Sequence, residues 1–400
     1  MKIFERIEAK KFWKILKSVE IPFKTEEINT KDSLGRVSAQ DIRAGEALPG
    51  FLRSAVDGYA TNSSFLKKAS DKSPQSFKII GEVQMGESFC ISIKNESCVW
   101  VPTGGILPEG ADCVIKFEDV EKIWNRIVVR EPVKKFENVI PSDNDLKEDE
   151  FVVKKGKTIT FSKLHALLSL GIWKVSVYEK IRIGIIPTGS ELVEPSESRR
   201  IPQIREANTH TLEAILKNHG YEVRRYGIVP DDERKLKEAF EKSISENHVT
   251  VISGGSFFGK KDFTRKVVES IEGLNLLVHG VLMMPGKSLI FADFGGKVLF
   301  GLPGKAQSFL LLSYTVLLPF LKSQFEIPDN VIKAPLSSEI EIRKNIPTII
   351  WARLENGYVI PIRAKSNVYK SLKMANGYVI FEKSCKCKKG DRVDFYYLEG

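Results

Sequence analysis

The order of apolar and polar residues divides the chain into four stretches with different patterns. Apolar side chains at helical spacing in 12–16 predict a helix near the N-terminus, followed by short extended segments to about residue 45. From about 48 to 130, short alternating runs separated by glycines and acidic turns predict a small barrel or sandwich. A Lys-, Glu- and Asp-rich stretch then leads to a helix around 162–170, which ends at Gly171.

Strands and helices alternate from residue 180 to about residue 325. This alternation is typical of a doubly wound, mainly parallel α/β domain. Residues 330–400 return to strand-like runs, and the Asn-Gly pairs at 356–357 and 376–377 indicate hairpin turns. The expected strands of the α/β part are 181–186, 222–228, 249–252 and 298–301, and the expected helices are 208–219, one that starts at Asp231 or Asp232, and one that ends at Phe320.

Composition narrows the class of protein. A chain of 400 residues, with 42% hydrophobic and 28% charged residues, is expected to fold into about two to four globular domains. The formal net charge of +10 favours anionic ligands, but the basic residues are spread along the chain, so nucleic acid is not an expected partner. Five cysteines without a Cys-x-x-Cys pair, and no apolar run long enough to cross a bilayer, predict a cytoplasmic protein without membrane contact.

Three predicted strands of the α/β part end in glycine-containing turns: Thr188-Gly189-Ser190, Ser253-Gly254-Gly255-Ser256 and Leu302-Pro303-Gly304. Ligands of open α/β sheets bind outside the carboxyl ends of the strands, and such turns let backbone amides approach an anion. Each glycine taken alone is explained by the shape of its turn. Three turns at one sheet edge predict a phosphate or oxyanion site, and no Walker A or G-x-G-x-x-G pattern is present.

Acidic residues follow the same strand ends. Carboxylates beside phosphate-binding amides suggest a Mg²⁺ ion that bridges to substrate oxygens, and the candidates are Glu191, Asp231, Asp232 and Asp262. The competing interpretation is helix N-capping, which we favour for at least one of Asp231 and Asp232. The five histidines show no ligand spacing.

Two further polar features are candidates for binding. Lys287 follows the turn Pro285-Gly286 and could direct its charge at an oxyanion, although a solvated lysine is the alternative. The segment Arg53–Ala60 carries charged, hydroxyl and glycine residues beside Pro49-Gly50. Its composition fits a capped turn and a binding loop equally well.

The motifs of the chain, in order, are SAVDGYA at 54–60, PTGGILPEGADCV at 102–114, TGSELV at 188–193, Ser253–Gly255 with Asp262, Pro285–Lys287 and GLPG at 301–304. Together they resemble the molybdopterin molybdotransferases, the family of the MoeA-like proteins and the E domain of gephyrin. The resemblance implies an elongated homodimer whose clefts form between subunits. The implied domains are a discontinuous N-terminal domain (1–47 and 131–178), an inserted small β domain (48–130), an α/β molybdopterin-binding domain (179–325) and a C-terminal β-barrel-like domain (326–400).

The resemblance also implies a reaction: insertion of molybdate, or tungstate, into adenylylated molybdopterin with Mg²⁺ and release of AMP. Asp57 would act from the partner subunit, and a molybdopterin adenylyltransferase would supply the substrate. The implied catalytic residues are Asp57, Asp145, Glu191, Asp231, Asp262 and Lys287, with Glu191 and Asp262 as metal ligands. The implied substrate-binding residues are Ser54, Gly58, Thr103, Gly104, Thr188, Gly189, Ser190, Asn208, Ser253, Gly254, Gly255, Ser256, Pro285, Gly286, Pro303, Gly304 and Lys305.

Some positions depart from the family pattern. Phe258 stands where a hydroxyl residue is usual, Met284 where a lysine is usual, and Lys305 where an asparagine is usual; the motif near 144 reads Asp143-Asn144-Asp145. Lys305 could restore the charge lost at Met284. A second hypothesis is therefore a non-catalytic paralogue or scaffold on the same fold that binds a pterin or nucleotide. Retention of all five candidate carboxylates favours the enzyme.

Overall fold

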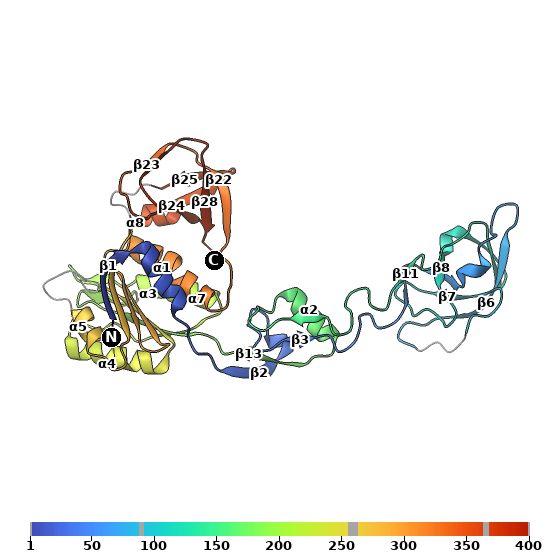
Figure 1. Ribbon diagram of the computed structural model, residues 1–400, viewed down its shortest axis with the longest axis horizontal. Helices are drawn as coiled ribbons and strands as arrows, with labels where there is room; N and C mark the ends of the chain where they lie inside the picture. Colours follow the sequence, from blue (N-terminus) through green and yellow to red (C-terminus); the bar gives the residue numbers. More distant parts are fainter. Residues whose placement is uncertain (1, 88–91, 255–262, 363–367, 399–400) are drawn as a thin grey trace.

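The computed structural model describes residues 2–87, 92–254, 263–362 and 368–398, and it shows an elongated molecule (Figure 1). An α/β domain and a C-terminal β domain lie together at one end, and a small β domain lies at the other end. A middle domain joins them, and the chain passes through it on the way to the β domain and again on the way back. No helix in the described part of the chain is long and apolar enough to span a membrane.

A seven-stranded sheet forms the centre of the α/β domain, in the order β1-β19-β20-β21-β18-β14-β17. Neighbouring strands are parallel except where β20 takes part. The doubly wound, mainly parallel sheet predicted from the sequence is therefore confirmed. The strands are β1 (Lys2–Glu8), β14 (Arg182–Pro187), β17 (Glu222–Arg225), β18 (Val249–Ser253), β19 (Leu276–Leu282), β20 (Ile290–Asp293) and β21 (Val298–Leu302).

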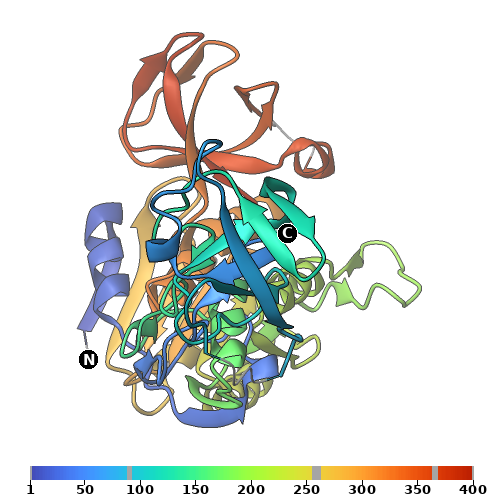
Figure 2. The same ribbon diagram turned by 90° about the vertical axis from the view of Figure 1, so that its right-hand side faces the viewer.

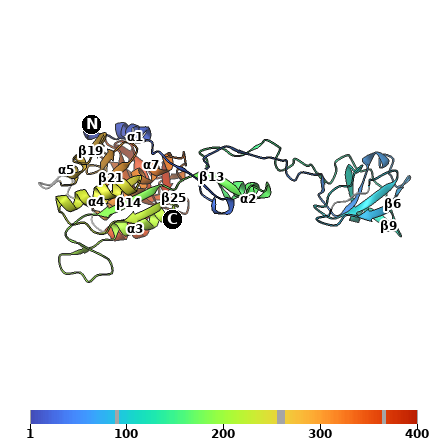
Figure 3. The ribbon, with the colours of Figure 1, turned by 90° about the horizontal axis from the view of Figure 1, so that it is seen from below.

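Helices cover both faces of this sheet (Figure 3). One face carries α1, α3 and a continuous segment of α6, a π turn and α7, and the other face carries α4 and α5. The predicted helix that ends near Phe320 is present, and Asp232 caps α4 by accepting a 2.9 Å hydrogen bond from the Lys235 amide, as expected for one of the two aspartates. The helices are α1 (Ala9–Ser18), α3 (Asn208–Asn218), α4 (Glu233–Glu246), α5 (Phe263–Glu269), α6 (Ala306–Leu312), the π turn (Ser313–Leu317) and α7 (Leu318–Ser323).

The start of the chain does not lie in the N-terminal domain to which the sequence-based division assigned residues 1–47. β1 pairs in parallel with β19 at the edge of the seven-stranded sheet. α1 follows and places the Phe12 ring 6.1 Å from the Phe291 ring in the α/β core. Only Ile7 of β1 is buried, so this edge strand lacks the continuous apolar run of the central strands. Its local pattern therefore does not identify a partner so distant along the chain.

The middle domain is built from two separated segments of the chain. β2 pairs with β13 and β3 with β12, and α2 packs against them around Ile159 and Leu167. Beyond them, the outgoing segment 44–55 and the returning segment 138–150 run side by side, joined by backbone hydrogen bonds such as Gly50 to Ser142 at 2.8 Å. The elements are β2 (Thr25–Asn29), β3 (Ile42–Arg43), β4 (Arg53–Ser54), β11 (Val139–Ile140), β12 (Phe151–Val153), α2 (Phe161–Ser169) and β13 (Lys174–Tyr178).

The inserted β domain, seen from its own end in Figure 2, is a curled six-stranded sheet in the order β8-β5-β7-β6-β10-β9. Buried side chains lie on both faces of the sheet, as expected for a small barrel. The strands are β5 (Gly58–Thr61), β6 (Gln75–Glu82), β7 (Ser97–Val101), β8 (Cys113–Lys116), β9 (Val120–Ile123) and β10 (Arg126–Val129).

The C-terminal domain is a curled antiparallel sheet in the order β22-β28-β26-β24-β25. The hairpin predicted at Asn356-Gly357 joins β24 and β25. The hairpin predicted at Asn376-Gly377 is wrong, because these residues join α8 to β26. The Asn376 side chain bonds the amide and carbonyl of Leu354 at 2.8 and 3.1 Å, a role that the Asn-Gly pair does not reveal. The elements are β22 (Val331–Pro335), β23 (Ile340–Ile342), β24 (Thr348–Glu355), β25 (Tyr358–Pro361), α8 (Val368–Met374), β26 (Gly377–Phe381), β27 (Cys385–Cys387) and β28 (Arg392–Tyr397).

Candidate functional site

The strand order changes direction between the ends of β14 and β18, and we call this part of the carboxyl edge of the sheet the crevice. From β14 the chain runs through α3 to β17 on one side, and then through α4 to β18 on the other side. Connections that leave neighbouring parallel strands in opposite directions leave a crevice at the carboxyl edge of the sheet, where ligands bind in such folds. β21 and β19 end at the same edge, since both are antiparallel to β20. The loops after β14, β18, β19 and β21 therefore share this edge.

The loops after β14, β18 and β21 form one connected floor. The Thr188 amide donates a 2.7 Å hydrogen bond to the Ser253 carbonyl, and the Gly254 amide donates a 3.2 Å bond to the Leu302 carbonyl. Gly254 has a φ of +105°, and a β-carbon there would lie 2.1 Å from the Thr188 carbonyl oxygen, so the close approach requires glycine. Thr188 and Ser253 are only 2% and 3% exposed. Their side chains therefore belong to the floor of the crevice.

The loop after β21 is also tied to the start of α3. The Asn208 side chain donates a 2.8 Å hydrogen bond to the Gly304 carbonyl. A β-carbon on Gly304 would lie 3.5 Å from the Gly254 Cα, so the second and third loops are in contact. Pro303 is half-buried, and Gly304 and Lys305 are exposed before α6 begins. The structure thus brings these sequence-predicted residues together with the first two loops.

Two of the predicted carboxylates lie at the mouth of the crevice. The Glu191 carboxylate lies over Gly189, because a β-carbon on Gly189 would stand 2.8 Å from Glu191 Oε2. The Asp231 amide donates to Ser190 Oγ at 3.0 Å, and the Ser190 amide donates to Asp231 Oδ2 at 3.5 Å. Glu191 and Asp231 are both exposed. Their oxygens are available for a hard cation, which prefers carboxylate ligands.

A Mg²⁺ ion fits this pair only with help from other ligands. Within the described ranges, no group of three or more His, Cys, Asp or Glu side chains could hold a metal ion. Mg²⁺ is commonly bound through one or two carboxylates together with water and substrate phosphates, so two exposed carboxylates suit it. Glu191 and Asp231 are the described residues that would hold it.

Two lysines supply positive charge at the same edge. Lys287 lies in the loop after β19, beyond the half-buried Pro285 and the buried Gly286, and Lys305 directly precedes α6. Both lysines are exposed, and neither forms an ion pair with a residue that the structure describes. Such cations favour phosphate or oxyanion ligands.

A partly buried ionic cluster includes Glu194, which closely follows Glu191 along the chain, and the sequence patterns did not indicate it. Arg225 Nη2 lies 3.2 Å from Glu194 Oε1 and 3.5 Å from Glu206 Oε2, and Arg225 Nε donates to Thr209 Oγ1 at 3.1 Å. His210 Nε2 lies 2.7 Å from Glu194 Oε2. This hydrogen bond is the largest cause that lowers the pKa of Glu194, and Arg225 adds to the lowering while burial opposes it. No motif joins these residues, because they come from separate elements.

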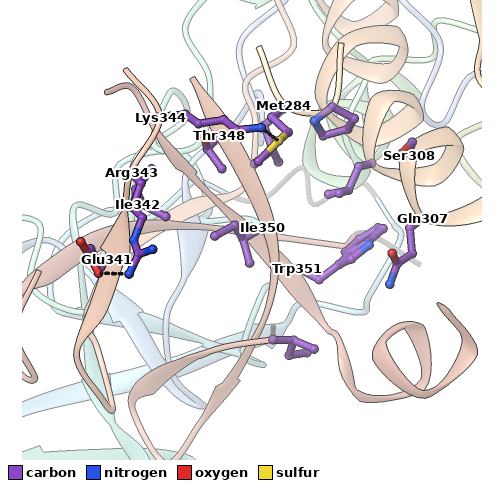
Figure 4. Close-up of a pocket in the computed structure, with 14 residues that line it drawn as sticks. Met284, Gln307, Ser308, Glu341, Ile342, Arg343, Lys344, Thr348, Ile350 and Trp351 are labelled. Carbon is purple, nitrogen blue, oxygen red and sulfur yellow. Dashed lines mark hydrogen bonds and ion pairs between the residues drawn. The ribbon is translucent and has the colours of Figure 1, made fainter. Parts of the chain in front are cut away.

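A pocket of about 560 Å³ adjoins this edge between the α/β domain and the C-terminal domain (Figure 4). Met284, Pro285 and Ser308 line it from the α/β domain, and Lys344 and Trp351 line it from the C-terminal domain. Lys344 Nζ lies 3.4 Å from Met284 Sδ, so a cation of the C-terminal domain stands beside residue 284. The indole nitrogen of Trp351 is buried and has no hydrogen-bond partner among the residues that the structure describes. The pocket has the size and mixed lining of a small-molecule site.

The remaining described candidates form a second group in the β domain. The Thr103 amide and hydroxyl donate to Asp57 Oδ1 at 2.7 and 3.0 Å, and the Gly104 amide donates to the Ser54 carbonyl at 2.7 Å. Asp57 and Thr103 are exposed. A β-carbon on Gly58 would lie 2.0 Å from the Ile115 carbonyl oxygen, so strand packing is sufficient to explain this glycine. Asp57 is thus a fixed, exposed carboxylate on a rigid loop.

Within one chain, the group around Asp57 lies far from the residues of the crevice. The β domain lies at the opposite end of the molecule from the crevice (Figure 1). Asp145 lies between them, where its amide donates a 3.0 Å hydrogen bond to the Leu48 carbonyl. Gly255, Ser256, Phe258 and Asp262 lie outside the residues that the structure describes.

Family models, related sequences and a solved structure all point to the same family, and together they cover most of the chain. Residues 7–171 match the family model described as the MoeA N-terminal region (domains I and II), and residues 184–323 match the model described as "Probable molybdopterin binding domain". A protein of Methanocaldococcus jannaschii that is assigned to molybdopterin biosynthesis is 31% identical over 388 residues, which cover 94% of this chain and 93% of that protein. The molybdopterin molybdenumtransferase of Haemophilus influenzae is 31% identical over 309 residues, or 77% of this chain and 75% of that protein. The crystal structure of the molybdopterin biosynthesis MoeA protein from Pyrococcus horikoshii OT3 superposes with a TM-score of 0.86 at 28% identity, over 98% of this chain and all (100%) of that one.

Proposed function

The chain belongs to the MoeA family of molybdopterin molybdenumtransferases, which acts in molybdenum cofactor biosynthesis, and we infer from this and from the crevice that it inserts an oxyanion into molybdopterin. We propose molybdate, or tungstate, as the oxyanion and adenylylated molybdopterin as its acceptor, with Mg²⁺ required and AMP released. The observation that carries the proposal is the shared sheet edge, where two exposed carboxylates and two exposed lysines lie on loops that are hydrogen-bonded to one another.

The residues at this edge suit a substrate with several negative charges. Lys287 and Lys305 would hold phosphate and oxyanion oxygens, and this positioning would supply much of the rate enhancement. Glu191 and Asp231 would orient Mg²⁺, which when bound would neutralise charge on the phosphoanhydride. Mg²⁺ would also keep these two carboxylates from repelling the substrate.

The pocket of Figure 4 would extend the site toward the C-terminal domain. Its lining combines the Trp351 side chain with the Lys344 ammonium. These groups suit a planar, polar ring system with hydrogen-bond acceptors. Since Lys344 stands beside Met284, the C-terminal domain supplies positive charge at the position where the family pattern places a lysine.

We further propose that the active unit is a homodimer. Asp57 and Thr103 form an ordered, exposed pair, yet they lie at the far end of their own chain from the crevice. A second subunit in the reverse direction would bring its β domain to the crevice of the first. This arrangement gives the exposed Asp57 carboxylate a role that its own subunit does not offer.

The decisive experiment is AMP release from adenylylated molybdopterin with molybdate, measured with and without Mg²⁺. We expect AMP release that depends on both molybdate and Mg²⁺. Tight binding of the adenylylated substrate without AMP release under any metal or oxyanion would contradict the transferase. It would support the second hypothesis, a non-catalytic pterin- or nucleotide-binding paralogue or scaffold.

A further inference from the structure

We propose that Arg225 is a positioning residue that holds Glu191 and Asn208 in place at the crevice, an inference that rests on the proposed function. Arg225 is the last residue of β17, which is the edge strand next to β14. Among the described residues, its guanidinium bonds Glu194, Glu206 and Thr209 rather than the floor of the crevice, so it would act through other residues. Glu194, Glu206 and Thr209 are its direct partners, and His210 joins the same ionic cluster through Glu194.

The cluster is centred on the Arg225 guanidinium. The guanidinium bonds Glu194, Glu206 and Thr209 at 3.2, 3.5 and 3.1 Å. The side chains of Arg225 and Glu206 are 14% and 2% exposed, so the guanidinium balances a carboxylate that water does not reach. A planar fork can bridge two carboxylates and a hydroxyl at once, whereas a lysine ammonium cannot reproduce this geometry.

The two glutamates stand at the two ends of an arm that begins beside Glu191. The arm leaves the sheet edge after β15 (Leu192–Val193) and returns through β16 (Ile204–Arg205), and it projects from the domain in Figure 2. The Ile204 amide donates to the Glu191 carbonyl, and the Glu206 amide donates to the Val193 carbonyl, both at 2.9 Å. Glu194 directly follows β15 and Glu206 directly follows β16. Arg225 therefore closes the base of the arm, and the closed base fixes the backbone of Glu191.

The same glutamate orients the start of α3. Glu206 accepts hydrogen bonds from the Thr209 amide and hydroxyl at 2.9 and 2.5 Å. Asn208, one residue earlier, donates to the Gly304 carbonyl of the third loop. Arg225 thus restrains Glu191, the proposed metal ligand, and also the hydrogen bond from Asn208 to Gly304. Loss of the guanidinium should loosen both without removing any group that touches substrate.

The test compares Arg225→Met with Arg224→Met. Arg224 is the neighbouring residue on β17, but its 59% exposed side chain pairs with Glu246 on the outside of the domain. Metal binding is measured with Mn²⁺ alone by electron paramagnetic resonance, and the Mg²⁺ dependence of AMP release is measured in parallel. We expect Arg225→Met to weaken Mn²⁺ binding and raise the activating Mg²⁺ concentration at least tenfold, with kcat at saturating Mg²⁺ changed less than threefold. Arg224→Met should stay within twofold of wild type in both measurements.

A second variant keeps the test decisive if Arg225→Met does not fold. The double variant Arg225→Met/Glu206→Gln leaves no unbalanced buried charge and retains an amide that can accept from Thr209. We expect it to fold and to show the same weakened Mn²⁺ binding. Wild-type Mn²⁺ binding in either folded variant would overturn the positioning role and leave the proposed function intact. A wild-type protein that neither binds Mn²⁺ nor responds to Mg²⁺ would overturn the metal site of the proposed function, and the positioning role with it.

Discussion

Ser190 and Asp231 bond to each other in both directions across the mouth of the crevice. The Asp231 amide donates to Ser190 Oγ at 3.0 Å, and the Ser190 amide donates to Asp231 Oδ2 at 3.5 Å. The first residue follows β14 and the second follows β17, so the contact joins the loops of two neighbouring strands. It also leaves one Asp231 oxygen directed away from Ser190 and available to a ligand. The neighbouring Asp232 differs, because it caps α4.

Asp231→Asn should lower turnover strongly and leave stability nearly unchanged. The side chain is exposed, and asparagine can still accept the weak bond from Ser190, so we expect little change in Tm. Loss of the charge that would orient Mg²⁺ should lower kcat by about 100-fold, with a smaller change in KM. Asp232→Asn is the matched control, since asparagine also caps helices well. Equal kcat values in AMP release for the two variants would contradict a role for Asp231 in the reaction.

Gly254→Ala should destabilise the α/β domain. Its β-carbon would lie 2.1 Å from the Thr188 carbonyl oxygen, at a φ of +105° that alanine rarely adopts. Because the floor joins three loops, relief of this clash would shift all of them, and we expect a loss of about 2–4 kcal/mol in the free energy of unfolding. Urea denaturation measures it. Gly45→Ala, where a β-carbon meets nothing within 4 Å, should change the value by less than about 1 kcal/mol.

Lys305→Asn should weaken anion binding and raise the stability of the ligand-free protein. Lys305 is the N-cap residue of α6, and its side chain makes no capping hydrogen bond. Asparagine would supply that bond and remove a charge that the helix dipole disfavours, so we expect a gain of about 1 kcal/mol in buffer without anions. If Lys305 holds the oxyanion, calorimetry should show at least tenfold weaker molybdate binding, or about 1.4 kcal/mol. Lys72→Asn, in a turn of the β domain, should leave molybdate affinity unchanged. If Lys305→Asn binds molybdate with unchanged affinity, Lys305 does not contact the oxyanion and is a solvent-exposed side chain without a binding role.

Light scattering should give the mass of a dimer at micromolar protein concentration. The expectation follows from the separation of Asp57 from the crevice within one chain. A mixture of Asp57→Asn and Asp231→Asn subunits offers a sharper check. If sites are shared between subunits, each heterodimer should have about half of wild-type activity and a randomly paired 1:1 mixture about a quarter, because one of the two sites of a heterodimer keeps both carboxylates. A monomeric mass with full activity would contradict the shared site.

The pH dependence of stability should reveal Glu194. Its pKa in the folded protein is lowered from the ordinary value of 4.5, first by the hydrogen bond from His210 and then by Arg225. A lowered folded-state pKa contributes stability that is present above pH 4.5 and is lost as the pH falls through the folded-state pKa. Glu194→Gln should therefore be less stable than wild type at pH 6–7, and the difference should shrink below pH 4.5. Thermal unfolding from pH 3 to 7 measures this, with Glu46→Gln at an exposed site as the control. If the difference in stability between Glu194→Gln and wild type stayed constant from pH 3 to 7, the hydrogen bond between Glu194 and His210 would not lower the pKa of Glu194 as proposed.

Local signals predicted the sheet and its loops well. The runs at 181–186 and 249–252 are continuous and apolar, and each is followed by a turn whose glycine the backbone needs. Since carboxyl ends of parallel strands meet at one edge, the proximity of Thr188, Ser253 and Gly304 followed from strand order alone. β1 was not predicted and the hairpin at Asn376-Gly377 was wrong, because the partners of these residues lie far along the chain. The pairing of Arg225 with Glu194 and Glu206 was invisible for the same reason, since charged residues carry no periodic signal for a buried partner.

The paired segments 44–55 and 138–150 determine how the β domain can move. A domain attached through one linker can swivel about that linker, whereas two hydrogen-bonded segments resist torsion and permit mainly bending. Asp57, carried at the far end, therefore sweeps a narrow arc in each subunit. The orientation of Asp57 is therefore already restricted before the subunits associate. Less orientational entropy is lost on assembly than would be lost with a single linker.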